Sequence, residues 1–383
     1  MTRRPQTETI AAEEAAPEAD RLEGFAHPRE TAELFGQSAA EAALLAAFQS
    51  GRMHHGWLLS GPEGVGKATL AYRFARYALT APDERASGPG LTVDLAAPSA
   101  RQIRVLSHPA LLVIRRPWNM QSKRHAATIP VDEVRRLKSF LQLSAEAGDW
   151  RVVIVDRAEE MNASAANALL KSLEEPPQRT IFLLVAAEPG RLLPTIHSRC
   201  RRLELPALDA ADLERAVAGP LAAAGVERPA AAQAEQLAGL ARGSVRRTLM
   251  LAQGGGIALY ERITGLLASL PRLDGEALHK LAETLAPAQA EQDFAMFFAL
   301  LQDMLGRAVR HGAGRGGALA GEAAMFDRLL GAGMGRAATL ARWAELWETI
   351  AREKVQVLAL NLDRKSFVLE TFLRLEAAHR TAA

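Results

Sequence analysis

The sequence of 383 residues contains a single cysteine, Cys200. A lone cysteine excludes an intramolecular disulfide, and it excludes a zinc site made from several thiolates of this chain. We therefore expect no zinc. One thiol also fits a protein of the reducing cytoplasm.

The sequence also lacks long apolar runs and a strong excess of charge of either sign. Its longest strongly apolar run covers residues 181–187, whereas a helix that spans a bilayer needs ~20 residues. Residues 1–30 contain no apolar signal-peptide core, and we expect residues 1–25 to form a poorly ordered tail. Because 46 lysines and arginines nearly balance 44 acidic residues, any contact with nucleic acid must come from local patches. A protein that is neither secreted nor embedded in a membrane is expected.

Segments typical of strands and helices alternate from Phe35 to Ala207, which predicts an α/β domain with a parallel sheet. Strands are expected at residues 57–60, 108–114, 151–155, 180–185 and 202–205. Helices are expected at residues 39–49, 67–79, 130–141 and 163–174. Residues 80–100, which contain several glycines and prolines, are expected to form a loop.

After Pro206 the strand pattern disappears and helical patterns continue to the C-terminus. Breaks at glycine and proline place domain boundaries near residues 206 and 265. We expect an α/β domain over 26–206, a small helical domain over 207–265 and a second helical domain over 266–383. The last domain has an apolar stripe at helical spacing, typical of a core face: Phe294, Phe297, Phe298, Leu301 and Leu305.

The strongest motif reads Gly-Pro-Glu-Gly-Val-Gly-Lys and lies between a predicted strand and a predicted helix, as a phosphate-binding loop does. Glycines at Gly61, Gly64 and Gly66 would let backbone N–H groups surround phosphate oxygens, and Lys67 would neutralise their charge. Asp156 ends a predicted strand, where a carboxylate can face a metal ion. A glycine turn without a ligand and a helix-capping aspartate are the structural alternatives.

Two positions of this motif depart from what ATP hydrolysis requires. Ala68 stands where a serine or threonine hydroxyl would bind Mg²⁺, and Thr69 lies one position later, about 100° further round the helix. Arg157 stands where ATPases of this layout usually have the glutamate that orients the attacking water. The Mg²⁺ site is therefore expected to be impaired, and the sequence leaves open whether ATP binds.

Two long segments resemble bacterial clamp-loader subunits of the AAA+ family. They are Asn-Ala-Leu-Leu-Lys-Ser-Leu-Glu-Glu-Pro-Pro, which ends at Pro177, and Leu-Pro-Thr-Ile-His-Ser-Arg-Cys, which ends at Cys200. Shorter support comes from His-Gly-Trp-Leu-Leu at His55 and from Gly-Ser-Val-Arg, which ends at Arg246. The resemblance covers about residues 30–255, and the remaining third is matched mainly by its helical character.

The resemblance implies an AAA+ P-loop domain, a helical lid and a helical collar, with the collars of five subunits packed into a ring. The implied neighbours are gamma/tau and delta subunits, and the implied work is the loading of a sliding clamp on primed DNA in the replisome. Arg199 matches the family's arginine finger, which reaches a neighbour's ATP, and Arg246 matches a lid arginine that senses nucleotide. Active members carry polar residues where this chain has Ala186 and Ala187.

Two functions follow from these observations. A chain that keeps a phosphate-binding loop without the metal hydroxyl, the catalytic acid and the polar strand end resembles a non-hydrolysing stator that lends Arg199 to its neighbour. Nucleotidyl transfer would then belong to the polymerase holoenzyme as a whole. The alternative is an active ATPase motor. The candidate nucleotide-binding residues are Gly61, Gly64, Gly66, Lys67, Thr69, Asp156 and Arg246.

A cationic stretch lies between residues 95 and 131, which include no acidic side chain. Such a stretch can contact DNA phosphates or an acidic partner, and a solvated loop surface is the alternative. Its cations are Arg101, Arg104, Arg115, Arg116, Lys123 and Arg124.

Overall fold

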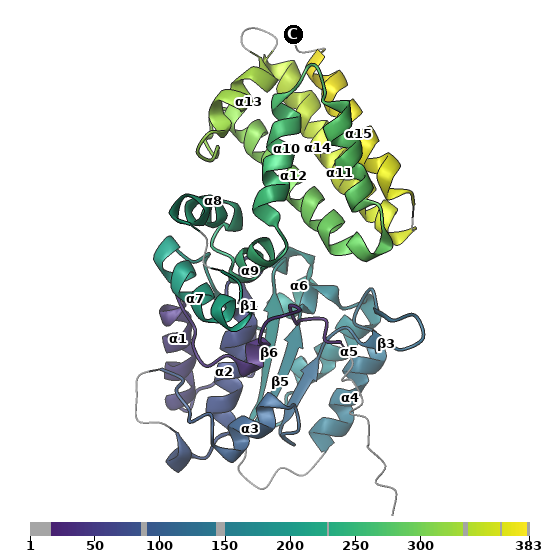
Figure 1. The fold of residues 1–383 in the computed structure, drawn as a ribbon. Helices are drawn as coiled ribbons and strands as arrows, with labels where there is room; N and C mark the ends of the chain where they lie inside the picture. The colour runs from purple at the N-terminus through teal and green to yellow at the C-terminus, as the bar shows by residue number, and fades with distance from the viewer. Residues whose placement is uncertain are drawn as a thin grey trace, which may run out of the picture. The chain divides into compact units, whose positions relative to one another are not determined.

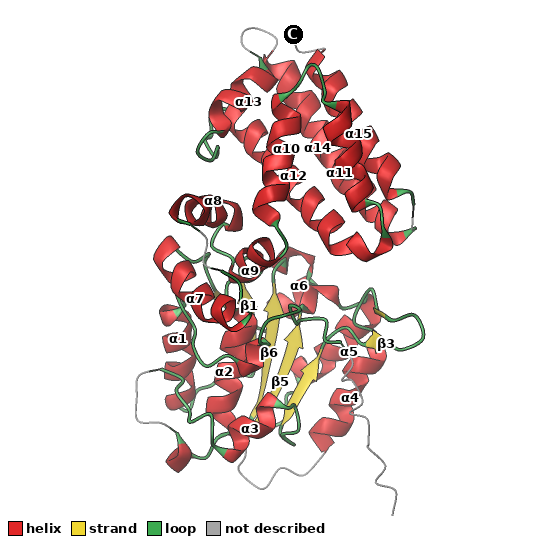
Figure 2. Ribbon diagram, in the orientation of Figure 1, coloured by secondary structure: helices red, strands yellow, loops and turns green. Residues whose placement is uncertain are grey.

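The computed structural model describes residues 17–85, 90–142, 150–227, 230–331, 336–360 and 362–380. The chain divides into two compact units, Met1–Ala216 and Val217–Ala383. The first contains every described strand, and the second is built from helices (Figure 2). The predicted fold class, a parallel α/β domain followed by an all-helical region, is confirmed. The boundaries predicted at residues 206 and 265 stay predictions.

The sheet of the first unit has five parallel strands within the described residues, in the order β2-β5-β6-β1-β7. Figure 1 labels the three neighbouring strands β5, β6 and β1. The central strands are almost continuously apolar because helices cover both faces of the sheet. The strands are β1 (Gly56–Ser60), β2 (Leu111–Ile114), β5 (Arg151–Asp156), β6 (Thr180–Ala186) and β7 (Arg201–Glu204).

Helices α4 and α5 pack on one face of this sheet, and α2 packs on β5 and β6. The buried stripe of α4 consists of Val134, Leu137 and Phe140, and Leu141 is half-buried. The helices of this unit are α1 (Ser38–Gln49), α2 (Lys67–Leu79), α3 (Pro98–Arg104), α4 (Val131–Gln142), α5 (Ala163–Glu174), α6 (Pro194–His197) and α7 (Ala210–Ala223). The last of them, α7, continues beyond Ala216, the last residue of the first unit.

Residues 17–31, here called the strap, differ from the expected poorly ordered tail. Phe25 is buried, and the strap contains a short 3-10 helix, Pro28–Glu30, whose cap is the side chain of His27. The strap is tied to the rest of the unit at α2, because Arg76 donates hydrogen bonds to the carbonyls of Arg29 and Thr31. Its acidic side chains reach the carboxyl edge of the sheet, as described below.

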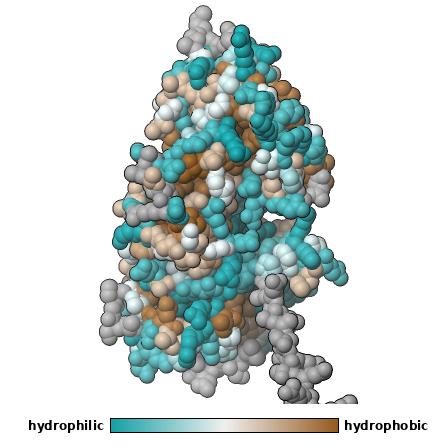
Figure 3. Space-filling view, in the orientation of Figure 1, coloured by the Kyte–Doolittle hydropathy of each residue, from teal (hydrophilic) through white to brown (hydrophobic). Residues whose placement is uncertain are grey.

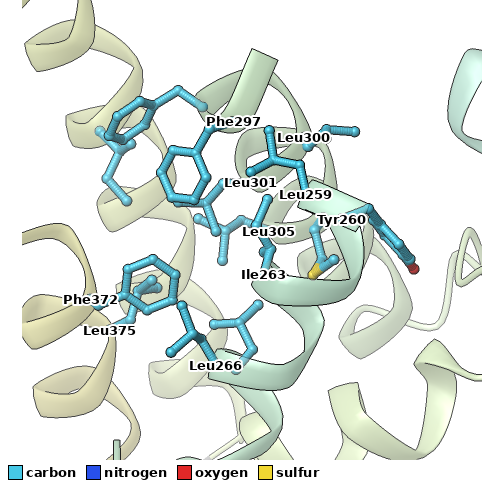
Figure 4. Packing of buried hydrophobic residues seen from close by; sticks show 14 of the residues in the cluster. Leu259, Tyr260, Ile263, Leu266, Phe297, Leu300, Leu301, Leu305, Phe372 and Leu375 are labelled. Carbon is cyan, nitrogen blue, oxygen red and sulfur yellow. The ribbon is translucent and has the colours of Figure 1, made fainter. Parts of the chain in front are cut away.

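The second unit has its own apolar core, which Figure 4 shows from close by. The predicted stripe of α12 is confirmed as core, since Phe294, Phe297 and Phe298 are fully buried. The helices are α8 (Ala231–Ala241), α9 (Val245–Gln253), α10 (Gly256–Ala268), α11 (Gly275–Leu285), α12 (Glu291–Gly312), α13 (Glu322–Leu330), α14 (Arg336–Ala359) and α15 (Arg364–Arg380).

The surface mixes hydrophilic and hydrophobic residues over the face in view (Figure 3). Four large apolar side chains among the described residues of the second unit are at least half exposed: Val355, Leu360, Leu362 and Leu373. No helix in the described part of the chain is long and apolar enough to cross a membrane.

Candidate functional site

The phosphate-binding loop follows β1 at the carboxyl edge of the sheet and leads into α2. The parallel register pairs Ser60 of β1 with Ala186 of β6, and Asp156 of β5 with Val185, so three strand ends meet there. In an open parallel sheet, ligands bind outside this edge. The structure thus brings the predicted loop and Asp156 together.

Gly61 sets the path of this loop. Its φ of +141° is a conformation that side chains other than glycine rarely adopt, and a Cβ at this position would lie 2.0 Å from the carbonyl oxygen of Leu205. Gly64 and Gly66 also have positive φ. The turn into α2 therefore has the glycine-dependent backbone of a phosphate-binding loop.

Lys67 is bonded to the loop that it follows. Its ammonium group donates to the carbonyl oxygens of Gly61 at 2.7 Å and Pro62 at 2.5 Å, and the residue is buried. Burial lowers the pKa of Lys67 to about 8, and the nearby carboxylates of Glu159 and Asp156 oppose that shift. The cation that would neutralise phosphate is thus engaged within the chain.

Asp156 is buried and has an acidic neighbour, Asp20 of the strap. Burial, together with the charge of Asp20 and a hydrogen bond with it, raises the pKa of Asp156 to about 7. Asp20 is itself fixed by Arg115 at 2.6 Å and by His27 at 2.9 Å. Burial alone would raise the pKa of Asp20. The hydrogen bond with His27 and the positive charges of His27 and Arg115 outweigh burial and hold this pKa well below its usual range.

The residues after Asp156 close the site with ion pairs and hydrogen bonds. Arg157, in the left-handed conformation with φ of +60°, pairs with Glu63 of the phosphate-binding loop and with Glu160 at 3.3 Å. One oxygen of Glu159 accepts hydrogen bonds from the backbone N–H groups of Ala187 at 2.8 Å and Glu188 at 3.3 Å. A carboxylate thus binds the end of β6, where this chain has Ala186 and Ala187 in place of the polar residues implied for active members by the resemblance.

The donor set does not fit a bound Mg²⁺. Ala68 has no oxygen, Asp156 is paired with another carboxyl group, and Arg157 places a cation beside it. The described residues also contain no cluster of three or more His, Cys, Asp or Glu side chains that could hold a metal ion. Thr69 is half-buried on α2 and stays a predicted nucleotide-binding candidate.

Arg199 belongs to a separate site, between α6 and β7. Its guanidinium group pairs with Glu174 of α5 at 2.7 Å and donates to the carbonyl oxygen of Thr195 at 3.0 Å and to the hydroxyl of Ser198 at 3.3 Å. One third of its side-chain surface stays exposed. Arg199 is therefore held by its own chain and still accessible.

The remaining candidates lie apart from these two sites. Arg246 is half-buried on α9 of the second unit. In the cationic stretch, Arg115 pairs with Glu18 and Asp20, and Arg116 pairs with Glu160 at 2.7 Å, so both serve the fold. The exposed cations of that stretch are Arg101, Arg104, Lys123 and Arg124.

Sequence reasoning missed three acidic residues that shape the site, Asp20, Glu63 and Glu159. Asp20 lay in the segment expected to be poorly ordered, and its partner Arg115 is 95 positions away, so no local pattern joins them. Glu63 could have been found from charge, since the unusual cation Arg157 needs acidic partners when it is partly buried. Glu159 binds backbone N–H groups, which no charge pattern indicates.

Comparisons with known proteins agree with the geometry of the first unit. A family model described as DNA polymerase III, delta subunit, matches residues 36–209. DNA polymerase III subunit delta-prime of Pseudomonas aeruginosa is 39% identical over 152 residues, which cover 40% of this chain and 43% of that protein. The delta-prime subunit of Escherichia coli is 35% identical over 158 residues, 41% of this chain and 44% of that protein.

Within the first unit the chain is similar to the delta-prime subunits of DNA polymerase III. It spans less than half the length of these delta-prime relatives. The tau subunit of Escherichia coli DNA polymerase III is 30% identical over 295 residues, 73% of this chain and 43% of that protein. Among solved structures, a gamma subunit-related protein of Thermotoga maritima covers 88% of this chain and 99% of its own, with a TM-score of 0.44 and 19% identity.

Proposed function

We propose that this chain is a clamp-loader subunit of DNA polymerase III that acts as a non-hydrolysing stator. It does not turn over ATP at its own site, and it supplies Arg199 to the ATP site of a neighbouring subunit while the sliding clamp is loaded on primed DNA. The contrast between its two sites carries the proposal. The groups of the phosphate site are bonded within the chain, while Arg199 is held at an accessible position.

The hydrogen bonds and ion pairs within the phosphate site support the absence of ATP hydrolysis there. Hydrolysis needs a metal ligand, a group that orients water and a lysine free to follow the phosphates. Here Asp156 is paired with Asp20, Arg157 bridges to Glu63, and Lys67 bonds to loop carbonyls. Each of these groups would have to leave its partner before it could act on a nucleotide.

The chemistry of Arg199 supports a role in trans. A guanidinium group is always charged and can grip a phosphate with two N–H groups. Arg199 does not belong to the cluster around Lys67, so its natural target is a nucleotide of another subunit. The resemblance to clamp-loader subunits names gamma/tau and delta subunits, in a ring of five, as the expected partners.

The test is the DNA- and clamp-stimulated ATPase rate of the reconstituted loader, with substitutions made only in this chain. We expect Arg199→Ala to lower the rate by an order of magnitude or more, since trans-acting arginines contribute 10³–10⁵ at a single site in other phosphoryl-transfer systems. Lys67→Ala should leave the rate nearly unchanged. Loss of a distinct share of turnover in Lys67→Ala would instead favour the ATPase motor.

A further inference from the structure

Glu174 is the acidic partner of Arg199. The two side chains meet at 2.7 Å, from the last residue of α5 and from the turn between α6 and β7. Both are partly exposed, Glu174 at 47% and Arg199 at 33% of their side-chain surface. The pair therefore lies at the surface, where a neighbouring molecule can reach the cation.

The position of Glu174 is not explained by the helix to which it belongs. The carboxyl end of a helix carries partial negative charge, so a carboxylate there is unfavourable and a cation such as Lys171 is preferred. Its neighbour Glu175 is exposed and forms no ion pair with any described residue. The Arg199 guanidinium is thus the contact that gives Glu174 a favourable electrostatic role.

The backbone under this pair is closely packed. A Cβ on Gly56, the first residue of β1, would lie 3.1 Å from the carbonyl oxygen of Arg199, 3.1 Å from the sulfur of Cys200 and 3.4 Å from Leu173. Leu173 is buried and directly precedes Glu174. The end of α5 and the Arg199 turn therefore rest on the same strand, which fixes the distance between the two backbones.

We infer that Glu174 is a positioning residue for Arg199: it holds the guanidinium in the orientation from which a neighbour's nucleotide phosphate can be gripped. This inference rests on the proposed function of Arg199 in trans. A guanidinium group has five N–H groups, and the contacts with Glu174, Thr195 and Ser198 need at most three of them. At least two N–H groups remain for a phosphate, so Glu174 can orient the cation without consuming it.

The expected effect is modest because the pair is exposed. Ion pairs of this kind are worth about 0.2–1 kcal/mol, and a free arginine side chain must lose considerable rotamer entropy when it docks. Removal of Glu174 should therefore lower the neighbour's catalytic rate by about 1.4- to fivefold, as the energy of an exposed pair implies. The KM for ATP should stay unchanged, since Arg199 would act in the transition state.

The experiment measures the steady-state ATPase of the reconstituted loader with Glu174→Ala, Glu174→Gln, Arg199→Ala and the double variant Glu174→Ala/Arg199→Ala in this chain. Glu175→Ala is the matched control, one position away and without an ion pair in the described structure. We expect the Ala variant to lower kcat, the Gln variant to restore part of it through its remaining acceptor oxygen, and the control to match wild type. In the double variant Glu174→Ala should add nothing to Arg199→Ala.

The outcomes separate this inference from the proposed function. If Arg199→Ala lowers the rate while Glu174→Ala does not, the trans role of Arg199 stands and the positioning role is wrong. A faster rate in Glu174→Ala would also overturn it, because Glu174 would then restrain the arginine. If Arg199→Ala has no effect, the proposed function itself fails. Thermal unfolding of each variant checks that a slower rate does not come from a less stable chain.

Discussion

At the scale of single residues, Asp156 has the most distinctive chemical environment in the first unit. Burial and the neighbouring Asp20 raise its pKa to about 7, whereas an exposed aspartate titrates near 4. The fold therefore favours the protonated form. Its contribution to stability is fully present below about pH 4 and is lost as the pH rises through 7.

Asp156→Asn, which resembles the protonated acid, should be less sensitive to pH than the wild type. Between pH 5.5 and 8.5 the wild type should lose about 2 kcal/mol of unfolding free energy relative to the variant. Urea unfolding at both pH values measures this difference. The low pKa of Asp20 makes no contribution in this window, since that group is ionised in both states.

Parallel pH profiles of the unfolding free energy in the two proteins would contradict the raised pKa of Asp156. Burial lowers the pKa of Lys67 to about 8, and Lys67 is buried in both proteins. The effect of this burial on the unfolding free energy therefore cancels when the two proteins are compared. Arg157 and Tyr72 also face this cluster and are retained in both.

At the scale of elements, the strap closes the carboxyl edge of the sheet through charge. Arg115, directly after β2, holds Glu18 and Asp20 at 2.6 Å each, and Arg29 of the strap holds Glu18 at 2.8 Å. These side chains are largely buried, so the removal of one cation leaves carboxylates without a partner in a poorly solvated place. The strap should therefore depend strongly on Arg115.

We expect Arg115→Ala to release the strap while the sheet stays folded. Hydrogen exchange of residues 17–31 should become at least tenfold faster, with little change in β5 and β6. Arg116→Ala is the matched control, because the neighbouring Arg116 pairs with Glu160 instead of with the strap. Equal exchange in both variants would show that apolar contacts such as Phe25 hold the strap.

The elements differ in how well local sequence predicts them. The prediction of helix 67–79 matches α2 at both ends, because the glycine-rich turn before it and Pro82 shortly after it mark its limits. The hairpin of β3 (Trp118–Asn119) and β4 (Arg124–His125) was missed, since strands of two residues show no period. The strap was missed because ion pairs between distant residues, not an apolar pattern, hold it in place.

The candidate site was predictable where a motif fixes the backbone and unpredictable where charges are paired. Gly61, Lys67 and Asp156 lie at one sheet edge as the order of strands requires. Their present partners come from other parts of the chain, and one sequence does not reveal which acid meets which cation. The nearness of Glu174 to Arg199 is of this second kind.

At the scale of the whole molecule, the two compact units have separate apolar cores. The second also contains a buried ion pair, Arg307 with Glu322 at 2.5 Å, to which the hydroxyl of Tyr260 donates at 2.7 Å. Both charged side chains are at most 2% exposed. A perturbation of this pair should therefore be felt first by the helical unit.

Glu322→Ala should destabilise the helical unit by about 3–5 kcal/mol, because it leaves the Arg307 cation buried without a partner. The double variant Arg307→Met/Glu322→Leu should recover most of that loss, since it removes both charges. Hydrogen exchange followed in urea distinguishes the units: α12 should lose protection in the single variant while β5 and β6 keep theirs. Equal loss in both units would show that they unfold together.

Cys200 has a practical consequence for labelling the protein with a fluorescent dye. Burial raises the pKa of this thiol to about 12, so almost none of it is the reactive thiolate at neutral pH. As the only cysteine of the chain, it leaves the protein nearly silent toward maleimide dyes. A cysteine introduced at the exposed Gly190, where a side chain meets no atom within 4 Å, would take up a single fluorophore at a known place and report on assembly in real time.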